Sequence, residues 1–277
     1  MTDELALPPP LPSPPVPARP VKRWRWWAHL LLLLPYPLLI GLAASARSET
    51  RGAALTGGWK SLLIVCSIEL AIFGALFGLA LGLSKATRDD LLLRLRRPGL
   101  TVLLGLAYSA ALRIGIGIVV LLIGVLLVMT KTVPQDSLLT FVKNNRPDVE
   151  TVVNVKALAE DPVYFWLTLT FVSFIVAGLR EELWRSGSLA GLRKVWPRAF
   201  GSRYGEFAAV AVTSLVFGLG HLPQGLLAVG ITALLGMALG SIMVAHRSLW
   251  TAVIAHGAFD ATSFALIPLA MEAMKKM

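Results

Sequence analysis

The chain has 277 residues, of which 56% are hydrophobic and only 15% are charged, and its mean hydropathy is +0.70. This number of charged residues is too small to cover the surface of a soluble domain of this size. The composition therefore argues against an ordinary soluble enzyme. The net charge of +10 raises the question of an anionic partner such as nucleic acid, which the positions of the basic residues must answer.

The first 25 residues are predicted to form a disordered, proline-rich and basic cytoplasmic tail. Eight of the 17 prolines lie among the first 20 residues, a composition typical of disordered or polyproline-II segments. Residues 22–27 (KRWRWW) then combine positive charge with indole rings. Such a cluster can bind nucleic acid, but here it directly precedes an apolar run. We therefore interpret it as a membrane-interface anchor and expect no nucleic-acid partner.

Seven apolar stretches follow, each near or above the length of about 20 residues that a membrane-spanning helix needs. They cover residues 26–44, 61–83, 100–129, 162–179, 207–222, 226–245 and 249–270. Backbone amides in lipid must form hydrogen bonds within the segment, so these stretches are predicted to be helices. The sequence thus predicts an all-α, polytopic membrane helix bundle with about seven transmembrane helices. The length of the third stretch leaves eight spans open.

Most of the lysines and arginines between the spans fall on the side that holds the N-terminus. Because positive residues stay in the cytoplasm, this bias predicts a cytoplasmic N-terminus. We expect a multi-pass protein of a bacterial inner (plasma) membrane. On this interpretation the net charge reflects topology rather than a ligand.

Ionisable residues within spans cost free energy and by default indicate a function. Glu69 and Arg113 have opposite charges on neighbouring predicted spans, so we expect them to form an internal structural ion pair. His29 and His246 lie near span ends and are expected to be structural. The other ionisable residues of this kind lie in the later spans and their continuations: Arg180, Glu181, Glu182, Arg185, His221, His256 and Asp260.

These later residues have helical spacings. Arg185 lies four residues after Glu181 and three after Glu182, so on a helix it can pair with either carboxylate. One glutamate can then be held ionised while the other is left for proton transfer. Phe217 and His221 are four residues apart, as are residues 256 and 260, which places each pair on one helix face.

Two chemistries remain open for this set. A glutamate beside a histidine can deprotonate water, and a second histidine can donate to the oxyanion that forms when water attacks an amide. The same groups could instead bind zinc with one position left for water, with Glu181, His221, His256 and Asp260 as candidate ligands. The sequence has no HExxH motif, and its single cysteine, Cys66, excludes a CxxC site, so a metal site would have to be assembled across helices.

Each of these pairs alone has an ordinary structural explanation, as a salt-bridged helix end or a packed histidine. Their occurrence in this order on consecutive spans favours a catalytic site. The three motifs are a glutamate pair followed by an arginine (EExxR) at residues 181–185, FxxxH at 217–221 and HxxxN/D at 256–260. With these motifs, residues 162–270 resemble the CPBP family of intramembrane proteases (CAAX proteases and bacteriocin-processing enzymes, also called Abi). The resemblance implies a four-helix catalytic core within residues 162–277. The predicted N-terminal transmembrane helices and polar loop of residues 26–161 lie outside the resemblance.

The resemblance also implies roles for the motif residues. Glu181 would be the general base that activates water, assisted by His221, and Glu182 and Arg185 would support that site. His256 and residue 260 would polarise the scissile carbonyl. CAAX proteases usually have asparagine at the last position, whereas Asp260 cannot donate a hydrogen bond when it is ionised. The expected catalytic set is Glu181, Glu182, His221, His256 and Asp260, supported by Arg185 and Phe217.

We therefore expect an intramembrane endopeptidase that cleaves a membrane-associated peptide or protein, with CAAX-type processing as one form of that activity. It would use either no cofactor or zinc. The alternatives are a catalytically inactive CPBP-like scaffold or immunity protein, and a proton-coupled transporter. A shared active site also has a geometric requirement. One helix must run from about residue 163 to 195 so that its carboxylates reach the histidines of the later spans.

Overall fold

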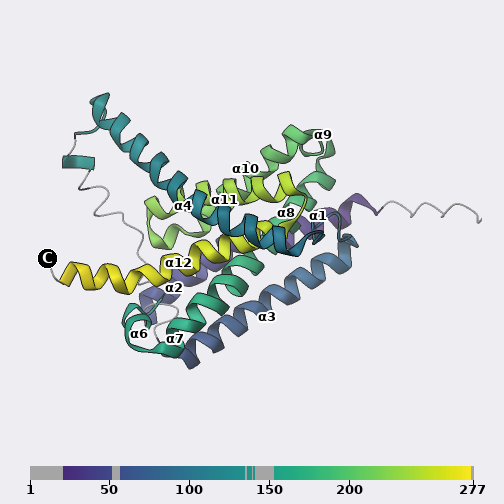
Figure 1. Cartoon of the computed structure of the whole chain (residues 1–277). Helices are drawn as coiled ribbons and strands as arrows, with labels where there is room; N and C mark the ends of the chain where they lie inside the picture. The colour runs from purple at the N-terminus through teal and green to yellow at the C-terminus, as the bar shows by residue number, and fades with distance from the viewer. Residues whose placement is uncertain (1–20, 52–56, 135, 139, 141–152, 276–277) are drawn as a thin grey trace, which may run out of the picture.

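The computed structural model describes residues 21–51, 57–134, 136–138, 140 and 153–275, which are mostly helical and contain no strand (Figure 1). Residues 1–20 of the predicted tail (residues 1–25) and most of the polar loop before residue 153 lie outside these ranges. Residues 23–25 of that tail are not disordered but form the start of the first helix. The helices are α1 (Arg23–Leu33), α2 (Tyr36–Arg51), α3 (Trp59–Ser84), α4 (Pro98–Met129), α6 (Val155–Glu160), α7 (Pro162–Leu167), α8 (Arg180–Val195), α9 (Pro197–Phe200), α10 (Arg203–Gly220), α11 (Leu226–His246) and α12 (Leu249–Lys275).

Six helical segments among the described residues are long and apolar enough to cross a membrane, and each coincides with a predicted span. They are Arg23–Ser45, Trp59–Ser84, Pro98–Met129, Pro162–Val195, Leu226–His246 and Leu249–Leu269. The predicted all-α, polytopic helix bundle is confirmed. The remaining predicted span, residues 207–222, corresponds to α10, which is a helix of 18 residues with Arg203 and Glu206 in its first turn and is not among the six.

Local sequence signals set several helix boundaries. The Asp161 side chain accepts hydrogen bonds from two backbone N–H groups and caps α7, and the Ser202 hydroxyl accepts one such bond and caps α10. Pro98 lies in the first turn of α4, where no backbone donor is needed. The first span is divided into α1 and α2 at Pro35, because a proline cannot continue the hydrogen-bond pattern of the helix before it.

The helix required for a shared site is present. Residues Pro162–Val195 form one continuous helical segment of 34 residues, which confirms the predicted helix from about 163 to 195. Its middle part, Thr168–Leu179, is a π-helix, which the sequence analysis did not predict. The Ser173 hydroxyl follows the same wide spacing and donates to the carbonyl of Thr168, five residues earlier, at 2.8 Å. Such π-helical segments are rare and often lie at functional sites.

The last part of this long helix, α8, lies at the centre of the bundle, and most of its residues are buried. Small residues let α1 approach it closely, since a Cβ atom on Gly187 would lie 2.6 Å from Leu33 Cδ1. His29 of α1 is fully buried, and its ring nitrogens lie 3.0 Å from the carbonyl oxygen of Gly187 and 3.1 Å from that of Ala80. His29 thus connects α1 to both α8 and α3, in agreement with a structural role.

The outer helices present large apolar side chains. On α4 the side chains of Leu103, Ile114 and Leu121 are 64–65% exposed. A soluble protein rarely leaves an apolar surface of this extent in water, so lipid tails are its natural surroundings. Figure 1 shows α12 running through the middle of the bundle, where it packs on α4, α11 and the π-helix. The chain is therefore an integral, multi-pass membrane protein.

Candidate active site

The three sequence motifs meet at one cavity of about 530 Å³. Its wall is formed by residues of α2, α3, the π-helix, α8, α10, α11 and α12. Five of the predicted site residues line it, namely Glu181, Phe217, His221, His256 and Asp260. Residues that are far apart in the sequence therefore share one chamber, as the shared-site hypothesis requires.

Glu182 and Arg185 lie behind this chamber, and neither is exposed. Arg185 Nη1 donates to Glu182 Oε1, so of the two partners that the spacing allowed, Arg185 takes Glu182. The same carboxylate oxygen lies 3.0 Å from His256 Nδ1. A carboxylate can only accept, so His256 carries a proton on Nδ1 and donates it to Glu182. Glu182 thus fixes the orientation of the imidazole.

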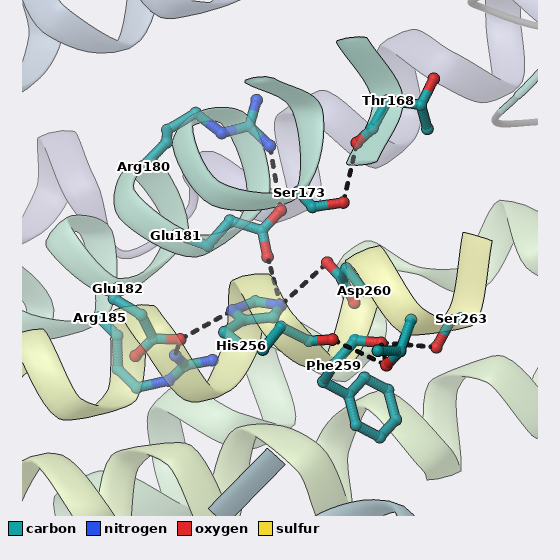
Figure 2. A network of polar contacts seen from close by, with 12 residues as sticks. Thr168, Ser173, Arg180, Glu181, Glu182, Arg185, His256, Phe259, Asp260 and Ser263 are labelled. Carbon is teal, nitrogen blue, oxygen red and sulfur yellow. Dashed lines mark hydrogen bonds and ion pairs between the residues drawn. The ribbon is translucent and has the colours of Figure 1, made fainter. Parts of the chain in front are cut away.

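The other nitrogen of His256 faces the chamber. Figure 2 shows this ring between Glu182 on one side and Glu181 and Asp260 on the other. Glu181 Oε2 lies 3.7 Å from His256 Nε2, and Asp260 Oδ2 lies 3.5 Å from the same atom. Both distances exceed those of ordinary hydrogen bonds, so Nε2 remains available to a further group.

Glu181 has its own cationic partner. Arg180 Nη2 donates to Glu181 Oε1 at 3.0 Å, which leaves Oε2 directed toward His256 (Figure 2). The Glu181 side chain is 18% exposed, whereas Glu182 is fully buried. The two adjacent glutamates therefore differ in partner and in access to the cavity.

His221 lies directly after the last residue of α10 and lines the same cavity. Its Nδ1 is 2.9 Å from the carbonyl oxygen of Phe217, which can only accept, so Nδ1 carries a proton. In the neutral imidazole Nε2 then has a free lone pair. The Phe217 ring lies near both histidines, with centroids 4.7 Å from His221 and 6.2 Å from His256. Among the described residues no hydrogen bond joins His221 to Glu181. The two side chains are related only by lining the same cavity.

One comparison with known proteins finds a match. Residues 162–262 match the family described as Rce1-like, "Type II CAAX prenyl endopeptidase Rce1-like". Over this segment the chain is similar to CAAX prenyl endopeptidases. The matched region runs from the start of α7 into α12 and contains all three motifs, so the resemblance to the CPBP family is confirmed. No match is found among curated proteins or among solved structures.

The predicted ion pair between Glu69 and Arg113 is wrong. Glu69 instead accepts from Arg180 Nη1 at 2.9 Å. Arg113 donates to the carbonyl oxygen of Phe259 at 2.6 Å, and its guanidinium lies 4.6 Å from the centroid of the Phe259 ring. The reason is helix packing, because α4 packs on α12, whereas α3 packs on α1, α7, α8 and the π-helix.

Arg180 is the residue whose role the sequence analysis missed. The sequence places Arg180 among the intramembrane charges but assigns no partner to it. Its side chain is 9% exposed, lines the cavity and contacts both Glu69 and Glu181. An arginine directly before a glutamate pair, inside a helix, is a signal that could have identified it.

The candidate zinc ligands do not gather as a metal site. Within the described part of the chain no three His, Cys, Asp or Glu side chains lie where they could hold a metal ion. The bond from His256 Nδ1 to Glu182 leaves Nε2 open to a ligand. Among the described residues, however, no hydrogen bond or ion pair joins His221 to the other candidates. Since this arrangement does not fit a preformed zinc site, we assign the catalytic steps to the side chains alone.

Proposed function

We propose that this protein is an intramembrane endopeptidase that hydrolyses a peptide bond of a membrane-associated peptide or protein, and that its reaction is CAAX-type processing. The observation that carries the proposal is the arrangement of Glu181. Arg180 holds one of its oxygens, and the other faces the cavity and His256 Nε2. A carboxylate held in this way can accept a proton from water.

The catalytic steps can be assigned to individual atoms. Glu181 Oε2 takes a proton from water while the water oxygen attacks the scissile carbonyl carbon. The Nε2 lone pair of His221 faces the same chamber and assists by orienting that water. The C–N bond then breaks, and the proton on Glu181 passes to the leaving amine, so that the carboxylate is regenerated.

His256 provides the electrophilic side of the reaction. With Nδ1 bonded to Glu182 and two carboxylates facing Nε2, the ring is best satisfied with a proton on each nitrogen. The Nε2 proton then donates to the carbonyl oxygen as negative charge develops on it. Asp260 cannot donate to that oxygen while ionised, so in this scheme it orients His256.

The setting of the reaction is part of the same proposal. The excess of lysine and arginine on one side of the spans supports a cytoplasmic N-terminus. The proposed location is a bacterial inner membrane. The cavity is lined by apolar residues of several spanning helices, which supports a substrate that reaches the site from the bilayer.

The test compares wild type with Glu181→Gln in proteoliposomes. The probe is a quenched-fluorescent peptide ending in a farnesylated CAAX sequence, with the unmodified-cysteine peptide alongside. Loss of the general base is expected to lower the cleavage rate by about 100-fold or more. Glu206→Gln is the matched control, because its carboxylate pairs with two arginines and does not line the cavity.

Equal cleavage by wild type and Glu181→Gln would contradict the catalytic assignment. Failure of wild type to cleave either peptide would contradict CAAX-type processing. A parallel cleavage assay with the chelator 1,10-phenanthroline tests whether the activity requires zinc. An unchanged rate supports water activation by side chains alone, whereas a loss that added zinc restores would overturn that mechanism.

A further inference from the structure

An acidic residue on an N-terminal helix reaches the active site. Glu69 lies in the middle of α3 and is the one Asp, Glu, Lys or Arg between residue 61 and the end of that helix. It lines the cavity, and its side chain is 28% exposed. A carboxylate at this depth is costly in a membrane and calls for a specific partner.

Arg180 is that partner, and it is shared. Its Nη1 lies 2.9 Å from Glu69 Oε2, and its Nη2 lies 3.0 Å from Glu181 Oε1. The guanidinium is planar and rigid, so a contact at one amino group fixes the direction of the other. Its buried position between two helices leaves little room for rearrangement while both contacts hold.

Sharing determines which oxygen of Glu181 remains available. A guanidinium with a single carboxylate partner tends to form two parallel hydrogen bonds, one to each oxygen. Such a contact would take up Glu181 Oε2, the oxygen that now faces His256 Nε2. Because Glu69 occupies one amino group, Arg180 binds Glu181 through Oε1 and leaves Oε2 open to the cavity.

We propose that Glu69 is a positioning residue for the proteolytic reaction, acting through Arg180 on the carboxylate of Glu181. This inference rests on the proposed function. It places part of the active site on α3, outside the segment of residues 162–262 that matches the CAAX protease family. A purely structural pair, in which Glu69 only neutralises a buried arginine, is the competing explanation.

The experiment measures kcat and KM of Glu69→Gln on the farnesylated quenched peptide, together with thermal unfolding in the same detergent. Glutamine keeps the shape but removes the charge that engages Arg180. We expect kcat to fall by about 10- to 100-fold, as for a misplaced catalytic group, with KM within about twofold. Glu69→Asp, which restores the charge, is expected to recover part of the loss. Glu206→Gln is the matched control and is expected to keep kcat within about twofold.

Arg180→Lys provides a second, independent variant if Glu69→Gln does not fold. A single ammonium lacks the fork that contacts both carboxylates, so a similar loss of kcat is expected. In the double variant the two losses should not add, because both changes break the same link.

The outcomes separate the two proposals. If Glu181→Gln cleaves as well as wild type, the proposed function fails. If Glu181→Gln is inactive but folded Glu69→Gln or Arg180→Lys retains the wild-type kcat, the positioning role is overturned and the pair is structural. A lower unfolding temperature without a change in kcat leads to the same conclusion.

Discussion

Two adjacent glutamates in this site have different surroundings and so are expected to fail in different ways. Glu182 is fully buried between Arg185 and His256, while Glu181 faces the cavity. Glu182→Gln leaves the Arg185 guanidinium buried without a charged partner. Removing one member of such a pair is expected to lower the free energy of unfolding by about 3–5 kcal/mol. Thermal or denaturant unfolding in detergent measures this.

Glu181→Gln is the comparison for that measurement, since it removes a partly exposed carboxylate and should leave stability nearly unchanged while abolishing cleavage. Equal unfolding curves for Glu182→Gln and wild type would show that Glu182 does not hold the buried arginine. The proposed assignment of Glu182 to stability and of Glu181 to catalysis would then have to be abandoned.

At the level of single residues, the sequence predicted which side chains gather but not all of their contacts. Glu181, His221 and His256, which the three motifs single out, line one cavity, while their catalytic roles stay predictions. The helical spacing left the partner of Arg185 open, because both glutamates lie within reach of it on a helix. The predicted partner of Glu69, which was based on opposite charges on neighbouring spans, was wrong. The true partner depends on which helices pack together, and this cannot be read from the order of spans.

At the level of elements, a polar clasp joins the ends of α8, α10 and α11. Glu206 accepts from Arg193 Nη1 at 2.8 Å and from Arg247 Nη1 at 2.6 Å. Burial raises the pKa of Glu206, but hydrogen bonds from Arg247 and Arg193 outweigh burial and hold the pKa below its usual value. Glu206→Gln is expected to lower the free energy of unfolding by about 1–3 kcal/mol at neutral pH.

The pH dependence of this clasp has a definite sign. Because the pKa of Glu206 is lower in the folded state, its contribution is fully present above the ordinary glutamate pKa of about 4.3. The contribution is lost as the pH falls through the lower, folded-state value. The difference between wild type and Glu206→Gln, followed by unfolding at a series of pH values, should therefore shrink on acidification. A difference that stays constant into strongly acidic solution would rule out this carboxylate as its source.

The long helix shows what apolar periodicity can and cannot reveal. Its extent follows from the need to bring Glu181 into the bundle, and the predicted limits agree with the continuous segment Pro162–Val195. The π-helix within it was not predictable, since residues 168–179 are apolar on nearly all sides and carry no period to read. This wider winding changes the direction in which α8 presents its charged residues relative to α7.

At the scale of the whole molecule, the cavity is not a property of the family segment alone. Tyr36, Ile40 and Gly41 of α2 and Cys66 and Glu69 of α3 contribute to its wall, although both helices lie outside residues 162–262. The predicted division into residues 26–161 and 162–277 remains a prediction. The packing of α1 on α8 and of α2 on α10 shows that the N-terminal helices and the matched segment form joint contacts.

The contact between α2 and α10 offers a direct test of this joint construction. A Cβ atom on Gly41 would lie 2.4 Å from the carbonyl oxygen of Gly220, so backbone meets backbone at the edge of the cavity. Gly41→Ala must push α2 away from α10. Overpacking of this kind is expected to lower the free energy of unfolding by about 1–3 kcal/mol and to reduce cleavage with it.

Gly74→Ala on α3 is the matched control, because a Cβ atom there meets nothing within 4 Å. In a helix interior this change is expected to be neutral or to stabilise by up to about 1 kcal/mol, since alanine is the better helix former. Unfolding and cleavage of both variants are measured side by side. If Gly41→Ala behaves like Gly74→Ala in both assays, α2 does not pack closely against α10 in the membrane. The claim that α2 forms part of the cavity wall must then be withdrawn.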